Sequence, residues 1–319
     1  MRKRILIFCF LMNILYVEQS FAEDVCYNMH NNAVQCIEKL ADEEGHNACG
    51  INCLYDVVKN SNGDSVLHIY KKDASLPASI REGAFSPNFY ADGVVKDNNE
   101  NAVPLENIVF DNDFETIGAY AFSGSGAQIS SASGKFVFND VDPYITFWGN
   151  TTLNGDIYFN KNVSGVLEES KVNGDIIFAD GVTNVGWFFA GNAEINGNII
   201  IPKSVQSIDI MAFAAASLTG KIYCAAGVES CYEMIKAGCK YEDESYNNTC
   251  LNRLEDMSYS GQLSAYPKGC DTLGSGALCT KCKSESFRLT SGKCHRLIYT
   301  IDEANRVAGP INRISITYR

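Results

Sequence analysis

Short apolar segments recur through the middle of the chain at related spacings. Six triplets carry apolar residues at their first and third positions, and their starts are 28, 21, 19, 23 and 23 residues apart. The triplets are Ile108–Phe110, Phe136–Phe138, Ile157–Phe159, Ile176–Phe178, Ile199–Ile201 and Ile222–Cys224. Because β-branched and aromatic residues favour strands, the pattern predicts one short strand in each repeat.

Polar corners and a second apolar row complete the repeat. Asn-Gly-Asp, Asn-Gly-Asn or Thr-Gly-Lys stands directly before four triplets, at 154–156, 173–175, 196–198 and 219–221. Glycine after asparagine supplies a positive φ at a tight corner. In the fifth repeat, Val205, Ile208 and Phe213 form the second apolar row. One such coil cannot bury its apolar side alone, so the coils are expected to stack as a solenoid with parallel strands about 4.8 Å apart.

The repeat between Ile199 and Phe213 resembles that of BspA-like bacterial surface leucine-rich-repeat proteins. Its Ile-x-Ile-Pro-x-Ser-Val-x-x-Ile order, followed by Ala212-Phe213, matches the family pattern, and parts of this pattern recur at 76–85 and 117–122. The resemblance covers about residues 66–224, although the third and fourth repeats lack the proline and the Ala-Phe pair. It implies a curved solenoid on or outside the cell, often adhesive or binding, and no catalytic residue.

Two other architectures share some of these features. A parallel β-helix of the kind seen in polysaccharide lyases would also have short strands and Asn-Gly corners. An immunoglobulin-like sandwich would need longer alternating strands without a fixed period, so it fits least well. We therefore predict a mainly β chain built on a leucine-rich-repeat solenoid, with the β-helix as the alternative.

The middle position of each triplet is the candidate binding surface. Side chains alternate along a strand, so the first and third positions point into the core and the middle positions point outward. The middle residues are Val109, Val137, Tyr158, Ile177, Ile200 and Tyr223. Stacked coils would align them as an apolar and aromatic stripe, and exposed apolar patches of this kind mark interaction surfaces. The other interpretation is that a terminal cap or a second copy covers the stripe.

A column of polar residues precedes the strands. It contains Asp156, Asp175, Asn198 and Lys221. Asp156 and Asp175 could hold a cation or act as a carboxylate pair in a glycosidase. The favoured interpretation is turn chemistry, because Asp and Asn cap turns with their own side chains.

The N-terminus has the features of a secretory signal peptide. Basic residues at 2–4 are followed by the apolar run from Ile5 to Val17 and by Ser20-Phe21-Ala22, which predicts cleavage after Ala22. No second apolar stretch of this kind follows, so no transmembrane segment is expected in the mature chain. We expect the protein to be secreted, periplasmic or exposed on the cell surface.

Cleavage would remove Cys9 and leave 12 of the 13 cysteines. An even number of cysteines in an exported protein predicts disulfides. The candidates are Cys26, Cys36, Cys49, Cys53, Cys224, Cys231, Cys239, Cys250, Cys270, Cys279, Cys282 and Cys294. They lie near the two ends of the chain, so the middle must be held together by packing.

The ends are predicted to cap the solenoid. Apolar residues from Val25 to Leu40 follow helical spacing, and Cys49 and Cys53 would share one face of a second helix. A short helix is also predicted from Ser230 to Ala237. The domains are therefore a signal peptide at 1–22, a helical cysteine-bearing N-terminal cap at 23–64, the solenoid at 65–241, a Cys-rich disulfide module at 242–296 and a C-terminal tail at 297–319. In the tail, the pattern predicts a strand at 297–300, a helix from Ile301 to Ala308 and a strand from Ile311 to Tyr318.

The Cys-rich module allows two interpretations. Cys270, Cys279, Cys282 and Cys294 match a zinc ribbon on spacing alone. Behind a signal peptide the same spacing is more typical of a small disulfide module. We favour disulfides and predict no metal or cofactor.

Composition narrows the function. The 319-residue chain carries a formal charge of −12 at pH 7 and only four histidines. Nucleic-acid binding depends on Lys and Arg contacts to phosphates, which argues against a nucleic-acid partner. We expect a non-enzymatic binding or adhesion protein that recognises a protein or glycan on a cell surface. The alternatives are a β-helix carbohydrate-active enzyme using Asp156 and Asp175, and a structural envelope component that self-associates through the stripe.

Overall fold

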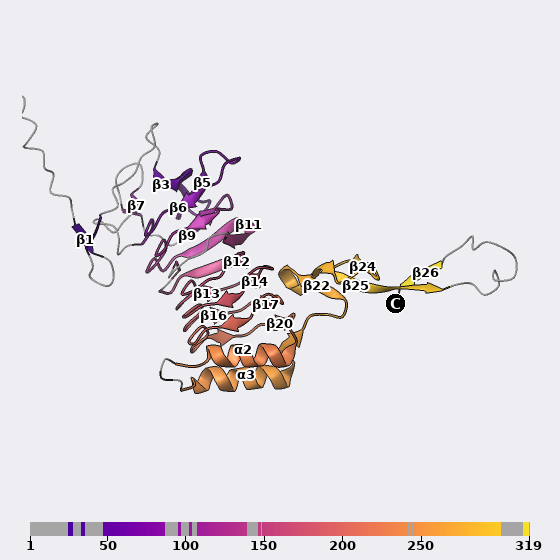
Figure 1. Cartoon of the computed structure of the whole chain (residues 1–319). Helices are drawn as coiled ribbons and strands as arrows, with labels where there is room; N and C mark the ends of the chain where they lie inside the picture. Colours follow the sequence, from indigo (N-terminus) through magenta and orange to yellow (C-terminus); the bar gives the residue numbers. More distant parts are fainter. Residues whose placement is uncertain are drawn as a thin grey trace, which may run out of the picture.

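The chain forms a mainly β structure around a β-solenoid of about five turns, seen in a computed structural model (Figure 1). The structure describes the side chains of residues 47–86, 107–138, 146–147, 149–241, 243 and 245–296. It also describes strand backbone at β1 (Val25–Tyr27), β2 (Ala33–Gln35), β7 (Val95–Lys96), β8 (Ala102–Val103), residues 297–300 and β26 (Ser315–Tyr318). The predicted signal peptide and the predicted helix from Ile301 to Ala308 lie outside the described residues.

Short strands of successive coils stack on one another in three columns. The first column contains the starts of β11 (Gln128–Phe138) and β12 (Thr152–Phe159), then β13 (Lys171–Val172), β16 (Glu194–Ile195) and β19 (Ser217–Leu218). The second contains the ends of β11 and β12, then β14 (Ile176–Phe178), β17 (Ile199–Ile201), β20 (Ile222–Cys224) and β21 (Leu263–Ala265). The third contains β15 (Asn184–Val185) and β18 (Ser207–Ile208). All these pairings are parallel, as the repeat pattern predicts.

Aromatic residues stack from coil to coil inside the solenoid. In the second column, Phe138 stacks on Phe159 with ring centroids 5.1 Å apart, and Phe159 stacks on Phe178 at 5.6 Å. In the part of each coil that leads back to the next coil, here called the return side, Phe122 stacks between Phe85 and Phe147. The ring centroids lie 5.3 and 5.5 Å apart. These rings are buried. Parallel ring pairs add to the apolar area that each coil buries on its neighbour, which holds the middle together without disulfides.

The corner glycines are required by close stacking. A Cβ atom at Gly174, Gly197 or Gly220 would overlap the carbonyl oxygen of the corner glycine in the coil before it. The positive φ expected at these corners occurs at Gly155, where φ is 150°, and not at the other three. The asparagines beside them form a ladder in which Asn173 Nδ2 donates to Asn154 Oδ1 over 2.8 Å, and Asn196 Nδ2 donates to Asn173 Oδ1 over 3.0 Å.

The N-terminal end is built from strands, so the predicted helical cap is wrong where the structure describes it. β1 and β2 lie within the predicted helix and pair antiparallel. β3 (Ala48–Ile51) turns into β4 (Cys53–Lys59), which pairs antiparallel with β5 (Ser65–Lys71). Asn52 makes the first turn with a φ of 53°, and the Cys49–Cys53 pair closes it. Residues four apart can face each other across a tight hairpin as well as along a helix, and the β-branched residues of β4 favour the hairpin.

β5 connects this end to the solenoid. Leu67 and Ile69 of β5 pair in parallel with Ile108 and Phe110 of β9 (Asn107–Phe110). β9 in turn pairs with the start of β11. On the return side, β3 pairs with β6 (Ser79–Ile80), which pairs with β10 (Thr116–Ile117). The first described coil is therefore completed by antiparallel strands.

The C-terminal end of the solenoid is covered by a helical hairpin (Figure 1). The predicted short helix lies within α2 (Val228–Gly238), and a second helix, α3 (Asn248–Ser260), follows it. Asn247 caps α3 by accepting the backbone N–H of Cys250, and the Cys239–Cys250 pair joins the two helices. The chain then returns as β21 beside β20. Residues 245–265, assigned to the Cys-rich module from the sequence, thus complete the end of the solenoid.

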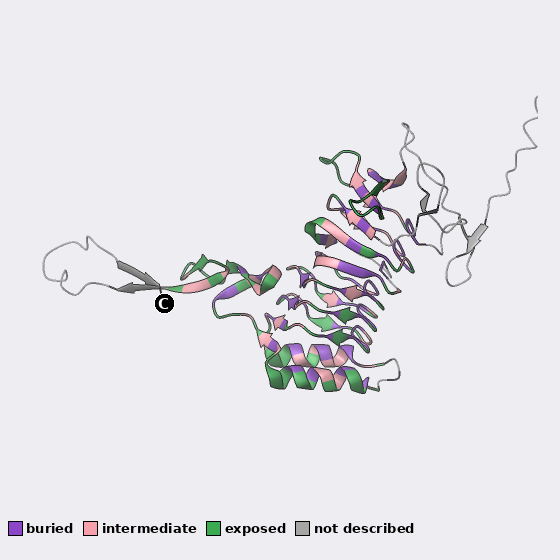
Figure 2. Ribbon diagram, turned by 180° about the vertical axis from the view of Figure 1, so that it is seen from behind, coloured by how far each residue is buried: buried purple, intermediate pink, exposed green. Residues whose placement is uncertain are grey.

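Residues 266–296 form a small module that projects from the side of the solenoid (Figures 1 and 2). It contains β22 (Cys270–Leu273), the short helix η1 (Ser275–Ala277), β23 (Cys279–Cys282), β24 (Phe287–Thr290) and β25 (Lys293–Thr300), with β26 paired to the end of β25. Antiparallel pairs join β22 to β23 and β24 to β25. The Cys270–Cys279 and Cys282–Cys294 pairs hold it together.

Candidate functional site

The six residues of the predicted stripe do not form one column. Val137, Tyr158, Ile177, Ile200 and Tyr223 are aligned by the parallel pairing of β11, β12, β14, β17 and β20. Val109 pairs instead with Ser130, at the start of β11. β11 is 11 residues long and shifts register between Ser130 and Lys135, so its two ends belong to different columns. The 28-residue spacing before Phe136, longer than the others, was the sequence signal of this shift.

The module packs on the stripe and covers its middle. Ile177 and Ile200 are 4% and 0% exposed, and they form a buried cluster with Cys270, Leu273 and Cys279. Tyr158 and Tyr223 pack against this cluster from either side and are half-buried, as are Val109 and Val137. The predicted exposure is therefore wrong for Ile177 and Ile200. Their apolar side chains point out of the solenoid and are removed from water by a second layer of the same chain.

Polar contacts fix the position of the module. The Gly276 backbone N–H donates to Asp175 Oδ2 over 2.7 Å. Ser275 contributes a backbone hydrogen bond to the Tyr158 phenol. Burial, and the nearby negative charges of Asp156 and Asp175, raise the pKa of Tyr158. Burial likewise raises the pKa of Tyr266, which lies where the chain leaves β21 for the module. These phenols therefore stay protonated and available as hydrogen-bonding groups under the module.

The corner carboxylates act as hydrogen-bond acceptors between coils. Asp156 Oδ1 accepts the backbone N–H of Asp175 over 2.8 Å. Asp175 Oδ1 accepts the N–H of Asn198 over 2.7 Å, and Asn198 Oδ1 accepts the N–H of Lys221 over 3.1 Å. Asp156, Asp175 and Asn198 thus each accept the backbone N–H at the corner of the next coil, 19 to 23 residues later, whereas the sequence pattern indicates capping within their own turns. Asp175 is in addition the acceptor that the module uses.

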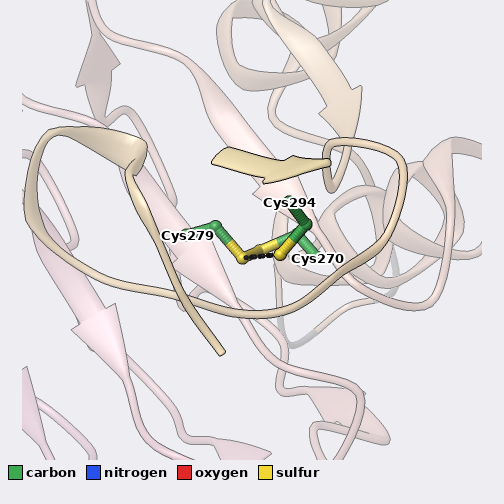
Figure 3. A group of neighbouring side chains, drawn as sticks. All are labelled: Cys270, Cys279 and Cys294. Atoms are coloured by element: carbon green, nitrogen blue, oxygen red, sulfur yellow. Dashed lines mark hydrogen bonds between the residues drawn. A yellow bond between two sulfur atoms is a disulfide. The ribbon is translucent and has the colours of Figure 1, made fainter. Parts of the chain in front are cut away.

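Sulfur atoms gather at the centre of the module (Figure 3). Cys279 Sγ lies 3.2 Å from Cys294 Sγ, and the sulfurs of Cys270, Cys279 and Cys294 all lie within 4.8 Å of one another. Zinc binds thiolates, whereas these sulfurs belong to the Cys270–Cys279 and Cys282–Cys294 pairs. Paired in this way they are not thiolates, so the geometry matches the disulfide interpretation of the spacing.

The outer part of the module carries a basic surface that whole-chain composition concealed. Residues 266–296 contain six Lys or Arg and two Asp or Glu, whereas residues 23–265 contain 14 and 33 respectively. In the β24–β25 pair, Arg288 lies opposite His295, and Thr290 lies opposite Lys293. Residues opposite each other, and those two apart, share a face of the sheet, so Arg288, Lys293 and His295 lie on one face. A charge count by segment would have found this surface in the sequence.

A second exposed surface lies at a corner of the solenoid. Trp187 is 39% exposed and makes an edge-on contact with the Phe188 ring, with centroids 4.3 Å apart. Phe188 has a φ of 51°, and Met211, one coil later, has a φ of 61°. The pairing of Val185 with Ile208 brings these corners together. Trp187 is thus an exposed aromatic residue at this corner, beside the half-buried Phe188.

Within the part of the chain that the structure describes, no helix is long and apolar enough to cross a membrane. Comparisons with protein-family models, curated proteins and solved structures gave no match. The function therefore has to be inferred from the surfaces described above.

Proposed function

We propose that this chain is an exported, non-enzymatic binding protein of the BspA-like leucine-rich-repeat type, in which the solenoid supports a recognition surface on the C-terminal module. The repeat between Ile199 and Phe213 supports the family assignment. The N-terminal basic and apolar pattern and the cysteine pairs support export. The observation that carries the proposal is the module itself, which occupies the strand face and holds its basic hairpin away from the solenoid (Figure 1).

The basic hairpin face is the surface best suited to a partner. Arg288 and Lys293 are exposed and lie diagonally across the β24–β25 pair. The two cationic side chains lie on one face of the strand pair, so both would attract an anionic ligand placed over that face. Arg also binds carboxylate and sulfate groups through two parallel hydrogen bonds. We propose that the partner is a glycan that carries carboxylate or sulfate groups.

The acidic solenoid does not prevent this binding. Charges separated by more than about 8 Å are largely screened at physiological ionic strength. The hairpin projects away from the strand columns in both views (Figures 1 and 2), so most of the acidic groups act on it weakly. At low ionic strength, the repulsion of an anionic ligand by the solenoid and its attraction to the hairpin would both act over longer distances. High salt would weaken the attraction to the hairpin.

The proposal is tested by capture of the chain from residue 23 onward on immobilised polygalacturonate, with neutral dextran as the comparison. We expect capture on the acidic glycan, loss of capture in high salt, and a loss of at least about tenfold in affinity with Arg288→Ser plus Lys293→Ser. The matched control is Lys161→Ser plus Lys203→Ser, which removes two exposed lysines of the solenoid and should leave capture unchanged. Equal capture on dextran, or an unchanged affinity of the hairpin variant, would refute the proposal.

Charge segregation also favours a second candidate, association of the basic module with the acidic solenoid of another copy. Sedimentation velocity separates the two. Self-association predicts a sedimentation coefficient that rises with protein concentration at low salt and reverts with Arg288→Ser plus Lys293→Ser. A concentration-independent coefficient together with glycan capture supports the glycan.

A further inference from the structure

One buried pair of cysteines is not joined in the structure. Eight of the ten cysteines with described side chains form four pairs whose Cα atoms lie 5.1–5.8 Å apart. The other two, Cys224 and Cys231, are each 0% exposed. Their thiols are hydrogen-bonded to each other. Two sulfurs in hydrogen-bond contact inside the core are close enough to react once either becomes a thiolate.

The backbone between them is held in a tight connection. Cys224 ends β20, Gly227 adopts a φ of 100°, and α2 begins at Val228. The Gly227 N–H donates to the Cys224 carbonyl over 3.3 Å, and the Cys231 N–H donates to the Gly227 carbonyl over 3.1 Å. These bonds turn the first part of α2 over the end of the strand, which is why the two side chains meet.

The pair lies where three parts of the molecule join. Cys224 pairs with Ala265 of β21, and its carbonyl accepts the N–H of Tyr266, the residue that leads into the module. Cys231 lies on the helix that Cys239 and Cys250 already join to α3. A bond between Cys224 and Cys231 would therefore continue that covalent connection from the two helices into β20.

We propose that Cys224 and Cys231 are a redox-convertible pair that closes into a disulfide between β20 and α2. The oxidant is a low-molecular-weight disulfide such as oxidised glutathione. The Cys224 thiolate attacks one of its sulfurs and releases one glutathione thiolate, which leaves a mixed disulfide on Cys224. The Cys231 thiolate then attacks the Cys224 sulfur and releases the second glutathione thiolate. Two protein thiols have lost two protons and two electrons, and one glutathione disulfide has become two thiols.

The order of attack follows from the surroundings of the two sulfurs. Hydrogen bonding from Cys231 lowers the pKa of the Cys224 thiol, while the same hydrogen bond and burial raise the pKa of Cys231. The thiolate is the nucleophile, so Cys224 reacts first. Because both sulfurs are buried, the exchange takes place during folding or when α2 opens locally.

Mass spectrometry tests the proposal on the chain from residue 23 onward. Trypsin releases both residues in one peptide, Ile222–Lys236, which contains no other cysteine. The chain is refolded over a range of reduced-to-oxidised glutathione ratios, alkylated with iodoacetamide in denaturant and digested. As the fraction of oxidised glutathione rises, we expect this peptide to change from the doubly alkylated form to an unalkylated form. That form should be two hydrogens lighter than the dithiol peptide. A peptide that stays doubly alkylated at every ratio, or that is found joined to another cysteine, would overturn the proposal.

A stability measurement gives a second, independent readout. Closing the pair should raise the melting temperature by several degrees relative to the dithiol form, and Cys224→Ser plus Cys231→Ser should abolish the difference. The single variant Cys224→Ser should leave Cys231 bearing one alkyl group or one glutathione. The Cys239–Cys250 pair is the internal control, since it should stay closed at ratios that open the first pair. The peptide assay on the unsubstituted chain decides the matter even if the variants do not fold.

Discussion

Asp175 accepts a hydrogen bond from the backbone N–H of Gly276, a residue 101 positions later in the chain. The same carboxylate accepts the N–H of Asn198 in the next coil. One buried side chain therefore serves both the stacking of the solenoid and the attachment of the module. This double role explains how a corner residue in a repeat can position a domain that the repeat does not include.

Replacement of this acceptor should loosen the module. Asp175→Ala leaves two backbone donors without their partner, which costs about 1–3 kcal/mol. The module should also detach more often, so that trypsin cuts after the exposed Lys268 faster than in the parent chain. The measurement is the rate at which the fragment beginning at Gly269 appears. Glu255→Ala, an exposed carboxylate on α3, is the control and should leave this rate unchanged.

The outward-pointing isoleucines should behave as core residues. Ile200 is fully buried beneath the module, so Ile200→Ala should lower the free energy of unfolding by about 2–5 kcal/mol. Val137, in the same column but half-buried, should lose about 1 kcal/mol or less on replacement by alanine. Urea unfolding measures both. Equal small losses would indicate that the module does not rest on this part of the strand face.

Replacement of a corner glycine should cost more than replacement of a glycine in an open position. Gly197→Ala would drive a Cβ into the carbonyl oxygen of Gly174, so adjacent coils must separate, and we expect a loss of about 3 kcal/mol or more. Gly126 has a φ of 63°, and no atom lies within 4 Å of the position that a Cβ would take there, so Gly126→Ala should cost only about 1 kcal/mol of backbone strain. Thermal unfolding compares the two. A similar cost for both would contradict close coil stacking as the reason for glycine at position 197.

The thermal stability of the protein should depend on the ionisation of Glu168. Burial raises the pKa of Glu168, and the neighbouring charge of Glu169 raises it further. A carboxyl whose pKa is higher in the folded state binds its proton more tightly there. The free energy of unfolding therefore falls as the pH rises from the pKa of the group in the unfolded chain through its pKa in the folded chain. Glu168→Gln should therefore raise the melting temperature at pH 7 and have little effect at pH 4. Glu255→Gln is the control, and the opposite pH dependence would contradict the stated surroundings of Glu168.

Repeat spacing in the sequence was enough to predict the solenoid and the alignment of its second strand column. Stacked coils place like residues over like, so a period of 19–23 residues between Phe136 and Cys224 carries the register directly. The corner carboxylates were interpreted as acceptors within their own turns, whereas they accept backbone N–H groups 19 and 23 residues later, because stacking brings the corners of successive coils together.

The parts that local pattern did not predict depend on contacts between distant segments. The bulge in β11 moved Val109 out of line with Val137, and hairpin pairing made strands where apolar spacing suggested helices. Above all, a strand face rich in isoleucine and tyrosine has the same sequence whether it faces water, a partner or another part of its own chain. Folding buried Ile177 and Ile200 under the C-terminal module because apolar side chains gain free energy from any cover that removes them from water. Which cover that is follows from the three-dimensional arrangement, and it moves the search for a partner from the strand face to the basic hairpin.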